Sequence, residues 1–111
     1  MLDLEKNIKN NLDFVIGGSH IIESALLNLV ENELKITLCI IDDALDKKII
    51  CFFGVKNDSI LDAISLLNNK NIIISIKSIS NSQLQNLNWE IHDTENEHLI
   101  FSCNSIDINC A

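Results

Sequence analysis

Two histidines and three carboxylates fall within seven residues near the end of the chain: His92, Asp93, Glu95, Glu97 and His98. Imidazole nitrogens and carboxylate oxygens are ligands of divalent metal ions, and a histidine pair can also act as general acid and base. The same residues suit a solvated hairpin loop with a histidine on each shoulder. No lysine or arginine lies nearby in the sequence to stabilise a phosphorane. We therefore favour the hairpin loop and expect no bound metal and no cofactor.

Other reactive side chains lack the neighbours that a catalytic site needs. The four cysteines, at positions 39, 51, 103 and 110, have no C-x-x-C spacing, which disfavours a zinc site. The first three lie in apolar, strand-like segments and are expected to be reduced, buried thiols, whereas Cys110 at the tail is expected to be exposed. Gly17-Gly18-Ser19 lacks the spacing and the lysine of a phosphate-binding loop. The chain is therefore predicted not to be an enzyme.

The charge balance excludes further classes of function. The 111 residues carry 16 Asp and Glu against 8 basic residues, all of them lysine, for a net charge of −8. A general nucleic-acid binder needs a basic face, so we expect no direct contact with nucleic acid. Charged residues interrupt the N-terminal segment, which is unlike a signal peptide, and the longest apolar run is far too short to span a membrane. We expect a soluble, cytoplasmic protein that does not bind membranes.

The acidic residues are unevenly placed, which gives them a possible role in recognition. They concentrate in polar segments between predicted elements, and the final third of the chain contains no base after Lys77. Such a cluster is either a solubilising surface or a surface complementary to a basic partner, for which opposite charge speeds association. The predicted binding residues are Asp42, Asp43, Asp46, Asp93, Glu95 and Glu97, with Asp58 and Asp62 as a second tier.

Hydrophobic periodicity predicts the elements that position these residues. Helical spacing over 2–14 predicts an N-terminal helix that ends at Gly17-Gly18, and a capping box at Ser59 and Asp62 predicts a short helix over about 59–69. Residues 19–32 fit a helix or a strand, and we favour a strand over 24–30. Alternation predicts strands over 33–41, 48–55, 71–80, 84–92 and 97–104, with an edge strand at 106–108.

This order of elements predicts a single α+β domain over 1–111, with a mostly antiparallel sheet of six to seven strands. The relative position of the two acidic loops, 42–46 and 93–97, depends on the connection through 56–71. If that connection returns the chain parallel, the loops share one end of the sheet. If it returns the chain antiparallel, they lie at opposite ends.

Residues 20–55 also carry a family resemblance. The run His20-Ile21-Ile22-Glu23-Ser24, the alternation Leu34-x-Ile36-x-Leu38 and the segment Phe52-x-Gly54-Val55 resemble small bacterial immunity proteins, including those of contact-dependent growth inhibition systems. The resemblance covers about a third of the chain. It implies an antitoxin that binds a cognate toxin domain, often a basic RNase or DNase, and covers its active site or substrate-binding face.

The sequence therefore predicts an immunity protein for a cationic nuclease toxin. Two other classes of function remain open. One is a small metal-dependent or histidine-based enzyme that uses His92 and His98. The other is a homo-oligomeric structural or regulatory module with an exposed sheet edge as its contact.

Overall fold

The fold is α+β, as the sequence predicts. The computed structural model describes residues 4–17, 20–42, 45–56, 60–68, 72–79 and 89–108. The described residues form eight strands rather than six to seven, together with two helices. In chain order these are α1 (Leu4–Lys9), β1 (Phe14–Ile16), β2 (His20–Val30), β3 (Glu33–Asp42), β4 (Lys47–Phe53), α2 (Ile60–Leu67), β5 (Ile74–Ser78), β6 (Trp89–Asp93), β7 (Leu99–Cys103) and β8 (Ser105–Ile108).

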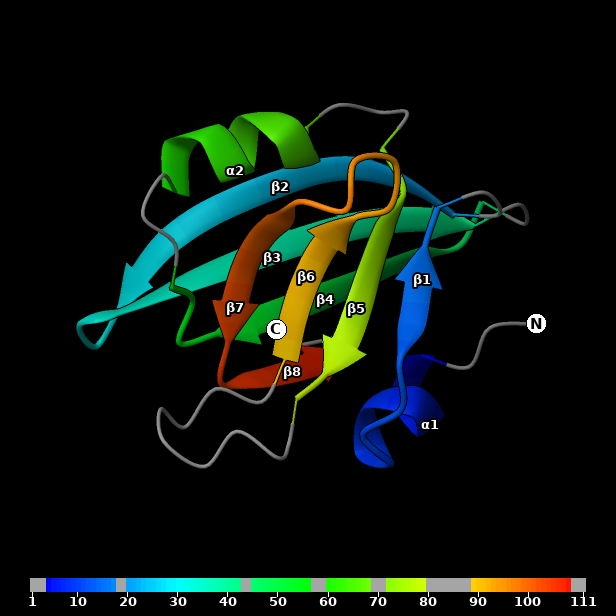
Figure 1. The fold of residues 1–111 in the computed structure, drawn as a ribbon, viewed down its shortest axis with the longest axis horizontal. Helices are drawn as coiled ribbons and strands as arrows, with labels where there is room; N and C mark the ends of the chain where they lie inside the picture. Colours follow the sequence, from blue (N-terminus) through cyan, green and yellow to red (C-terminus); the bar gives the residue numbers. More distant parts are fainter. Residues whose placement is uncertain are drawn as a thin grey trace.

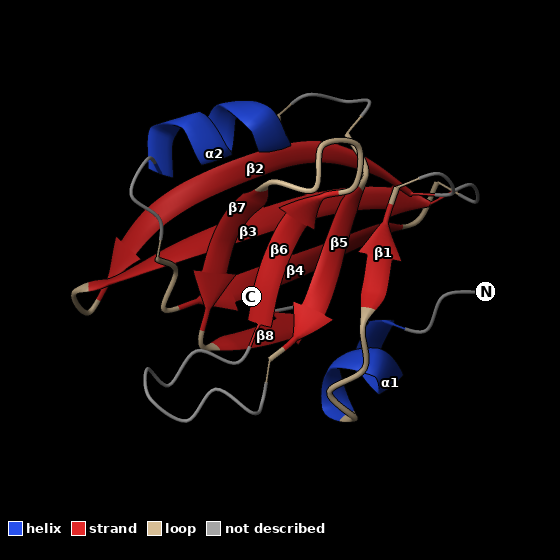
Figure 2. Cartoon of the chain, viewed as in Figure 1, coloured by secondary structure: helices blue, strands red, loops and turns tan. Residues whose placement is uncertain are grey.

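The strands divide into two four-stranded sheets rather than one. Sheet A has the order β1-β5-β6-β7 and sheet B the order β2-β3-β4-β8, with every described pairing antiparallel. Sheet A lies in front of sheet B in Figure 1, and the helices lie at the margins of the sheets (Figure 2). Helix α2 contacts β2 and β7, which belong to different sheets, and α1 contacts β8. No helix in the described ranges is long and apolar enough to cross a membrane.

The hydrophobic core lies between the sheets because each strand turns alternate apolar side chains inward. In β3 the inward side chains are Ile36, Leu38 and Ile40, all fully buried. The two sheets meet at Phe52 of β4 and Phe101 of β7, whose rings lie edge to face at a centroid distance of 5.1 Å. These aromatic residues therefore fix the spacing of the sheets at the centre of the molecule.

The ambiguous segment 19–32 is a strand. Strand β2 begins at His20 and pairs with β3 through a two-residue turn, Glu31-Asn32, which connects the directly opposed residues Val30 and Glu33. Both turn residues have positive φ, 51° and 68°, as a type I′ hairpin turn requires. The strand is longer than the predicted 24–30. A register shift between Ile22 and Ser24 lets its pairing with β3 continue towards the N-terminus as far as His20, which lies opposite Asp42.

The predicted N-terminal helix is too long. Helix α1 covers only Leu4–Lys9, and Asn11, with φ 55°, lies in the left-handed conformation that follows many helices. The chain then becomes β1, in which Phe14 pairs with Ile76 of β5 and packs edge to face against Trp89 at 6.3 Å. The helical periodicity continues to Val15, but pairing with β5 decides the structure of this segment. The Val15 side chain, which the helical pattern would bury, is 46% exposed.

The other predicted strands are found with shifted ends. Segments 48–55, 71–80 and 97–104 correspond to β4, β5 and β7, and the edge strand at 106–108 corresponds to β8. Of the predicted strand 84–92, the structure describes β6 from Trp89 onward, and residues 80–88 lie outside the described residues. Strand β4 ends at Gly54, whose φ of 66° and close approach to the Asn104 side chain leave no room for a Cβ.

The expectation of four reduced cysteines is wrong for Cys51. Cys51 is buried and disulfide-bonded, and its partner lies outside the described residues, whereas Cys39 and Cys103 are free. The pattern of apolar residues correctly indicates the burial of Cys51, but it carries no information on oxidation. A disulfide needs only a second sulfur at the right distance, which depends on the tertiary fold.

Helix α2 is tied to β2 by one side chain, that of Asn68. The backbone N–H of Ala25 donates to Asn68 Oδ1 at 3.1 Å, and Asn68 Nδ2 donates to the carbonyl oxygens of Ala25 and Ile64 at 3.3 and 2.9 Å. Strand β2 is an edge strand of sheet B. The Asn68 amide therefore takes the place of a neighbouring strand at Ala25 and protects that part of the edge.

We expect Asn68→Ala to lower the free energy of unfolding by about 1–2 kcal/mol, because the edge backbone at Ala25 loses both partners. The change can be measured by urea denaturation. Asn28→Ala is the matched control, since Asn28 is an exposed asparagine on β2, the strand that contains Ala25. Equal losses in the two variants would show that Asn68 does not hold the helix to the sheet.

Candidate functional site

The β3–β4 hairpin presents the first group of acidic residues. Asp42 closes its turn: its Oδ1 accepts a hydrogen bond from the Asp46 N–H at 3.0 Å, and its own N–H donates to the Asp46 carbonyl at 3.1 Å. Asp46 itself is exposed. Lys47, which follows, forms an ion pair with Glu23 at 3.4 Å. The Asp46 carboxylate thus projects from a turn whose backbone is held by Asp42, and Asp43 lies outside the described residues.

The β6–β7 hairpin presents the second group, and here the acids divide by role. Asp93 is only 6% exposed, because its carboxylate faces into the turn: Oδ1 accepts from the Glu95 N–H at 2.9 Å, and Oδ2 from Asn96 Nδ2 at 3.4 Å. Glu95 and Glu97 are exposed at the tip. Asp93 was predicted as a binding residue, but the structure gives its carboxylate a structural contact. In this hairpin the exposed carboxylates are those of Glu95 and Glu97.

The two hairpins lie at the same end of the molecule. In sheet A, the turn after β6 is anchored on Ile73, whose carbonyl accepts from both Thr94 N–H and Thr94 Oγ1, at 3.1 and 3.0 Å. The chain leaves sheet A at Gly17, which packs directly against the Ile73 side chain, and it enters sheet B at His20, opposite Asp42. The three residue steps from Gly17 to His20 span at most about 11 Å, which keeps the hairpins at neighbouring corners.

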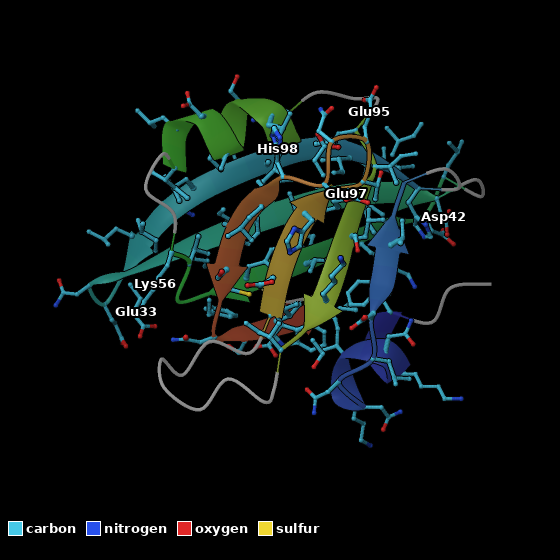
Figure 3. The ribbon with its side chains drawn as sticks, viewed as in Figure 1. Glu33, Asp42, Lys56, Glu95, Glu97 and His98 are labelled. Carbon is cyan, nitrogen blue, oxygen red and sulfur yellow. The ribbon has the colours of Figure 1, made fainter. Side chains whose placement is uncertain are left out.

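Figure 3 shows the same arrangement. Asp42 lies at the right-hand end, Glu95 and Glu97 lie on the hairpin at the upper right, and Glu33 and Lys56 lie at the opposite end. Of the two placements that the sequence left open for the acidic loops, the structure has the one with both loops at one end. We call the carboxylates of Asp42, Asp46, Glu95 and Glu97 the acidic end.

Of the two second-tier residues, Asp62 does not join the acidic end. Asp62 is exposed in the first turn of α2, where a carboxylate interacts favourably with the helix dipole. That turn follows the end of β4, so it lies at the end of the sandwich opposite the acidic loops. The helical segment runs from there to Asn68, which bonds Ala25 in the middle of β2. Asp58 lies outside the described residues.

We expect Asp93→Ala to cost about 1–3 kcal/mol of folding free energy, because the Glu95 N–H loses its acceptor inside the turn. Glu95→Ala is the matched control and should change stability by less than about 0.5 kcal/mol, since its side chain is exposed. Chemical denaturation of both variants measures the difference. A stability loss confined to Glu95→Ala would refute the structural role of Asp93.

The histidines do not form a metal site with the acids around them. His92 is half-buried on the outer face of sheet A, and its Nε2 lies 3.2 Å from Glu90 Oε1. His98 is exposed, beyond the turn, and contributes its backbone carbonyl to the Asp93 N–H at 2.9 Å. Within the described ranges, no group of three or more His, Cys, Asp or Glu side chains could hold a metal ion.

The free cysteines are poor nucleophiles. Burial raises the pKa of the Cys103 thiol to about 12. Burial also raises the pKa of Cys39, and the hydrogen bond to Glu23 and the negative charge of Glu23 raise it further. A raised pKa keeps the thiol protonated at neutral pH, whereas the thiolate is the reactive form. Neither side chain is therefore activated for covalent catalysis.

Sequence reasoning missed a shallow cavity beside the acidic end. It has a volume of about 160 Å³ and lies on the outer face of sheet A, lined by Ser75, Lys77, His92, Asp93, Thr94 and Glu97. Alternation in β5 and β6 does indicate that Ser75, Lys77, Glu90 and His92 share one face, and this was the available signal. Glu97 lies near that face because the β6–β7 hairpin turns back over it. The periodicity of a strand does not predict the path of a hairpin loop.

The chain was also compared with known proteins. Comparisons with family models, with curated proteins and with solved structures found no match to it.

Proposed function

We propose that this protein is an immunity protein that binds and neutralises a cationic toxin domain, with the acidic end as its recognition surface. One observation carries the proposal: two hairpins from different sheets present exposed carboxylates, Asp46, Glu95 and Glu97, at the same end of the molecule. The resemblance of residues 20–55 to small bacterial immunity proteins adds the class of partner, a basic RNase or DNase.

The chemistry of such a partner explains why carboxylates suit the task. A nuclease binds the phosphates of its substrate with lysine and arginine side chains, and carboxylates can occupy the same positions. Opposite charge also accelerates encounter and disfavours wrong partners. The turns that carry these carboxylates are fixed by backbone N–H groups that donate to the side chains of Asp42 and Asp93, so little ordering is needed when the partner binds.

Co-expression tests this proposal. A candidate toxin domain, taken from a gene next to this one, is produced in cells with and without this chain, and the two proteins are then purified together. We expect the cells to survive only with this chain present and the two proteins to co-purify at low salt. Cell death despite co-expression, or separate elution at low ionic strength, would refute the proposal.

We place the site of action in the cytoplasm, where such toxins act on nucleic acid. Such a target supports the cytoplasm, whereas the disulfide at Cys51 is typical of oxidising compartments. Alkylation in denaturant, applied to freshly lysed cells so that the buried Cys51 is accessible, and followed by mass spectrometry, decides between the two compartments. We expect Cys51 to be alkylated in a cytoplasmic protein, and an intact disulfide would contradict this location.

A further inference from the structure

A second, larger cavity lies at the end of the molecule opposite the acidic end. Its volume is about 320 Å³, and it is lined by residues 32–34, residues 54–56 and Asn104. These residues come from the β2–β3 hairpin, from the segment that follows β4 and from the junction of β7 with β8. Because β7 belongs to sheet A and the other strands to sheet B, the cavity lies where the two sheets join. The proposed recognition surface does not use it.

Backbone hydrogen bonds hold the walls of this cavity in place. The N–H of Val55 donates to the Leu34 carbonyl oxygen at 3.0 Å, and Lys56 and Ser102 exchange N–H to carbonyl bonds of 2.8 and 3.1 Å. The N–H of Asn104 donates to the carbonyl oxygen of the last residue of β4 at 2.8 Å. The cavity is therefore preformed, and a small ligand can bind without first ordering the protein.

Two opposite charges line the cavity without pairing with each other. Glu33 and Lys56 are both exposed, and Figure 3 shows them at the same end of the molecule. Within the described ranges, neither side chain forms an ion pair or a hydrogen bond with another residue. Each charge is therefore available to a ligand group of opposite sign, and such charge-assisted contacts are stronger than those between neutral groups.

The buried part of the wall is apolar. Val55 is only 4% exposed, and Leu34 is half-buried beside it, held by the backbone bond between the two residues. Asn32 and Asn104 add neutral amide groups to the lining. An apolar wall with a few polar groups that fix orientation is typical of small-molecule sites.

We propose that this cavity binds a free α-amino acid with an apolar side chain, its ammonium group at Glu33 and its carboxylate at Lys56. An anion without a positive charge is repelled by Glu33, and a cation without a negative charge is repelled by Lys56. An α-amino acid carries both charges on one carbon, and its side chain can lie against Leu34 and Val55. The volume is near the lower limit for ligand pockets, which suits a ligand of this size.

Binding of an amino acid here does not depend on the proposed toxin binding, because the two sites lie at opposite ends of the molecule. Failure of one proposal therefore leaves the other untouched.

Titration of the ¹⁵N-labelled full chain with leucine, valine, methionine and phenylalanine, followed by the amide NMR signals, tests the site. We expect saturable shifts at Gly54 and Lys56 with at least one of the four. For a ligand of about ten non-hydrogen atoms, the expected Kd is on the order of 0.1–1 mM. No saturable shift with any of the four up to about 20 mM would overturn the proposal. Saturable shifts confined to other parts of the chain would also overturn it.

Two derivatives of the tightest-binding amino acid test the need for both charges. Its amide lacks the carboxylate, and its N-acetyl derivative lacks the ammonium group. We expect each derivative to bind at least about fivefold more weakly than the free amino acid, because one charge of the cavity loses its partner. A smaller loss for either derivative would overturn the assignment of a zwitterionic ligand.

Four single variants locate the contacts. Glu33→Gln and Lys56→Gln remove the two charges of the cavity, whereas Glu31→Gln and Lys77→Gln make the same changes at exposed residues that do not line it. We expect each cavity variant to weaken binding at least about fivefold and each control to change it less than about twofold. Circular dichroism confirms that all four variants are folded. Equal effects in the cavity variants and their controls would refute the assignment to this cavity.

Discussion

Reversing three charges at the acidic end, with Asp46→Lys, Glu95→Lys and Glu97→Lys combined, is expected to weaken binding of the proposed cationic toxin domain at least 100-fold. This corresponds to about 2.7 kcal/mol of binding free energy. The three carboxylates are exposed and project from fixed turns, so the substitutions replace attraction by repulsion without removing core contacts. Isothermal titration calorimetry measures the affinity, and stopped-flow mixing should show that much of the loss lies in the association rate.

A charge-matched control separates the site from the net charge. Glu31→Lys, Glu33→Lys and Asp62→Lys change the total charge by the same amount, and all three residues are exposed away from the acidic end. We expect this triple variant to bind the toxin domain within about tenfold of the unmodified protein, through the loss of long-range attraction alone. If both triple variants lose affinity equally, the net charge and not the acidic end drives binding.

Phe52→Ala is expected to lower the free energy of unfolding by about 3–5 kcal/mol. Phe52 is fully buried and meets Phe101 edge to face at 5.1 Å, so truncation opens a cavity between the two sheets and removes an aromatic contact. Such a loss is a large part of the stability of a domain of this size. Urea denaturation measures it, and a lower midpoint with an unchanged slope would show that stability falls without a change in the surface exposed on unfolding.

Phe53→Ala is the control for this prediction because the neighbouring ring points to the other face of sheet B. Phe53 is half-buried and contacts Lys35 rather than the core. We expect a cost below about 1.5 kcal/mol. A larger loss for Phe53→Ala than for Phe52→Ala would contradict the assignment of the inner and outer faces.

The strands were predictable where one sheet face is buried and the pattern is strictly alternating. In β3 the buried Ile36, Leu38 and Ile40 are separated by half-buried residues, and the sequence shows this directly. The short strand β1 was not predictable, because Val15 continues the helical stripe of the preceding segment and the three residues become a strand only by pairing with β5. The division into two sheets depends on similar long-range contacts, such as Phe52 with Phe101.

The candidate site shows the same limit. Charge counting located the hairpins and their exposed acids, Asp46, Glu95 and Glu97. It did not separate these from Asp93, because a carboxylate that caps its own turn and one that faces solvent are identical in sequence. It also grouped Asp62 with the loops, although α2 carries that residue to the opposite end of the molecule. Separating these roles requires knowledge of hydrogen bonds and of strand order.

The turn held by Asp93 has a consequence for how this protein can change during evolution. The turn uses the backbone N–H of residue 95, which every amino acid except proline supplies, so position 95 can exchange one side chain for another without weakening the hairpin. Position 97 has φ 57° and tolerates asparagine, aspartate and glycine best. The hairpin tip can therefore acquire new recognition chemistry step by step, while the burial of Asp93 keeps the scaffold intact.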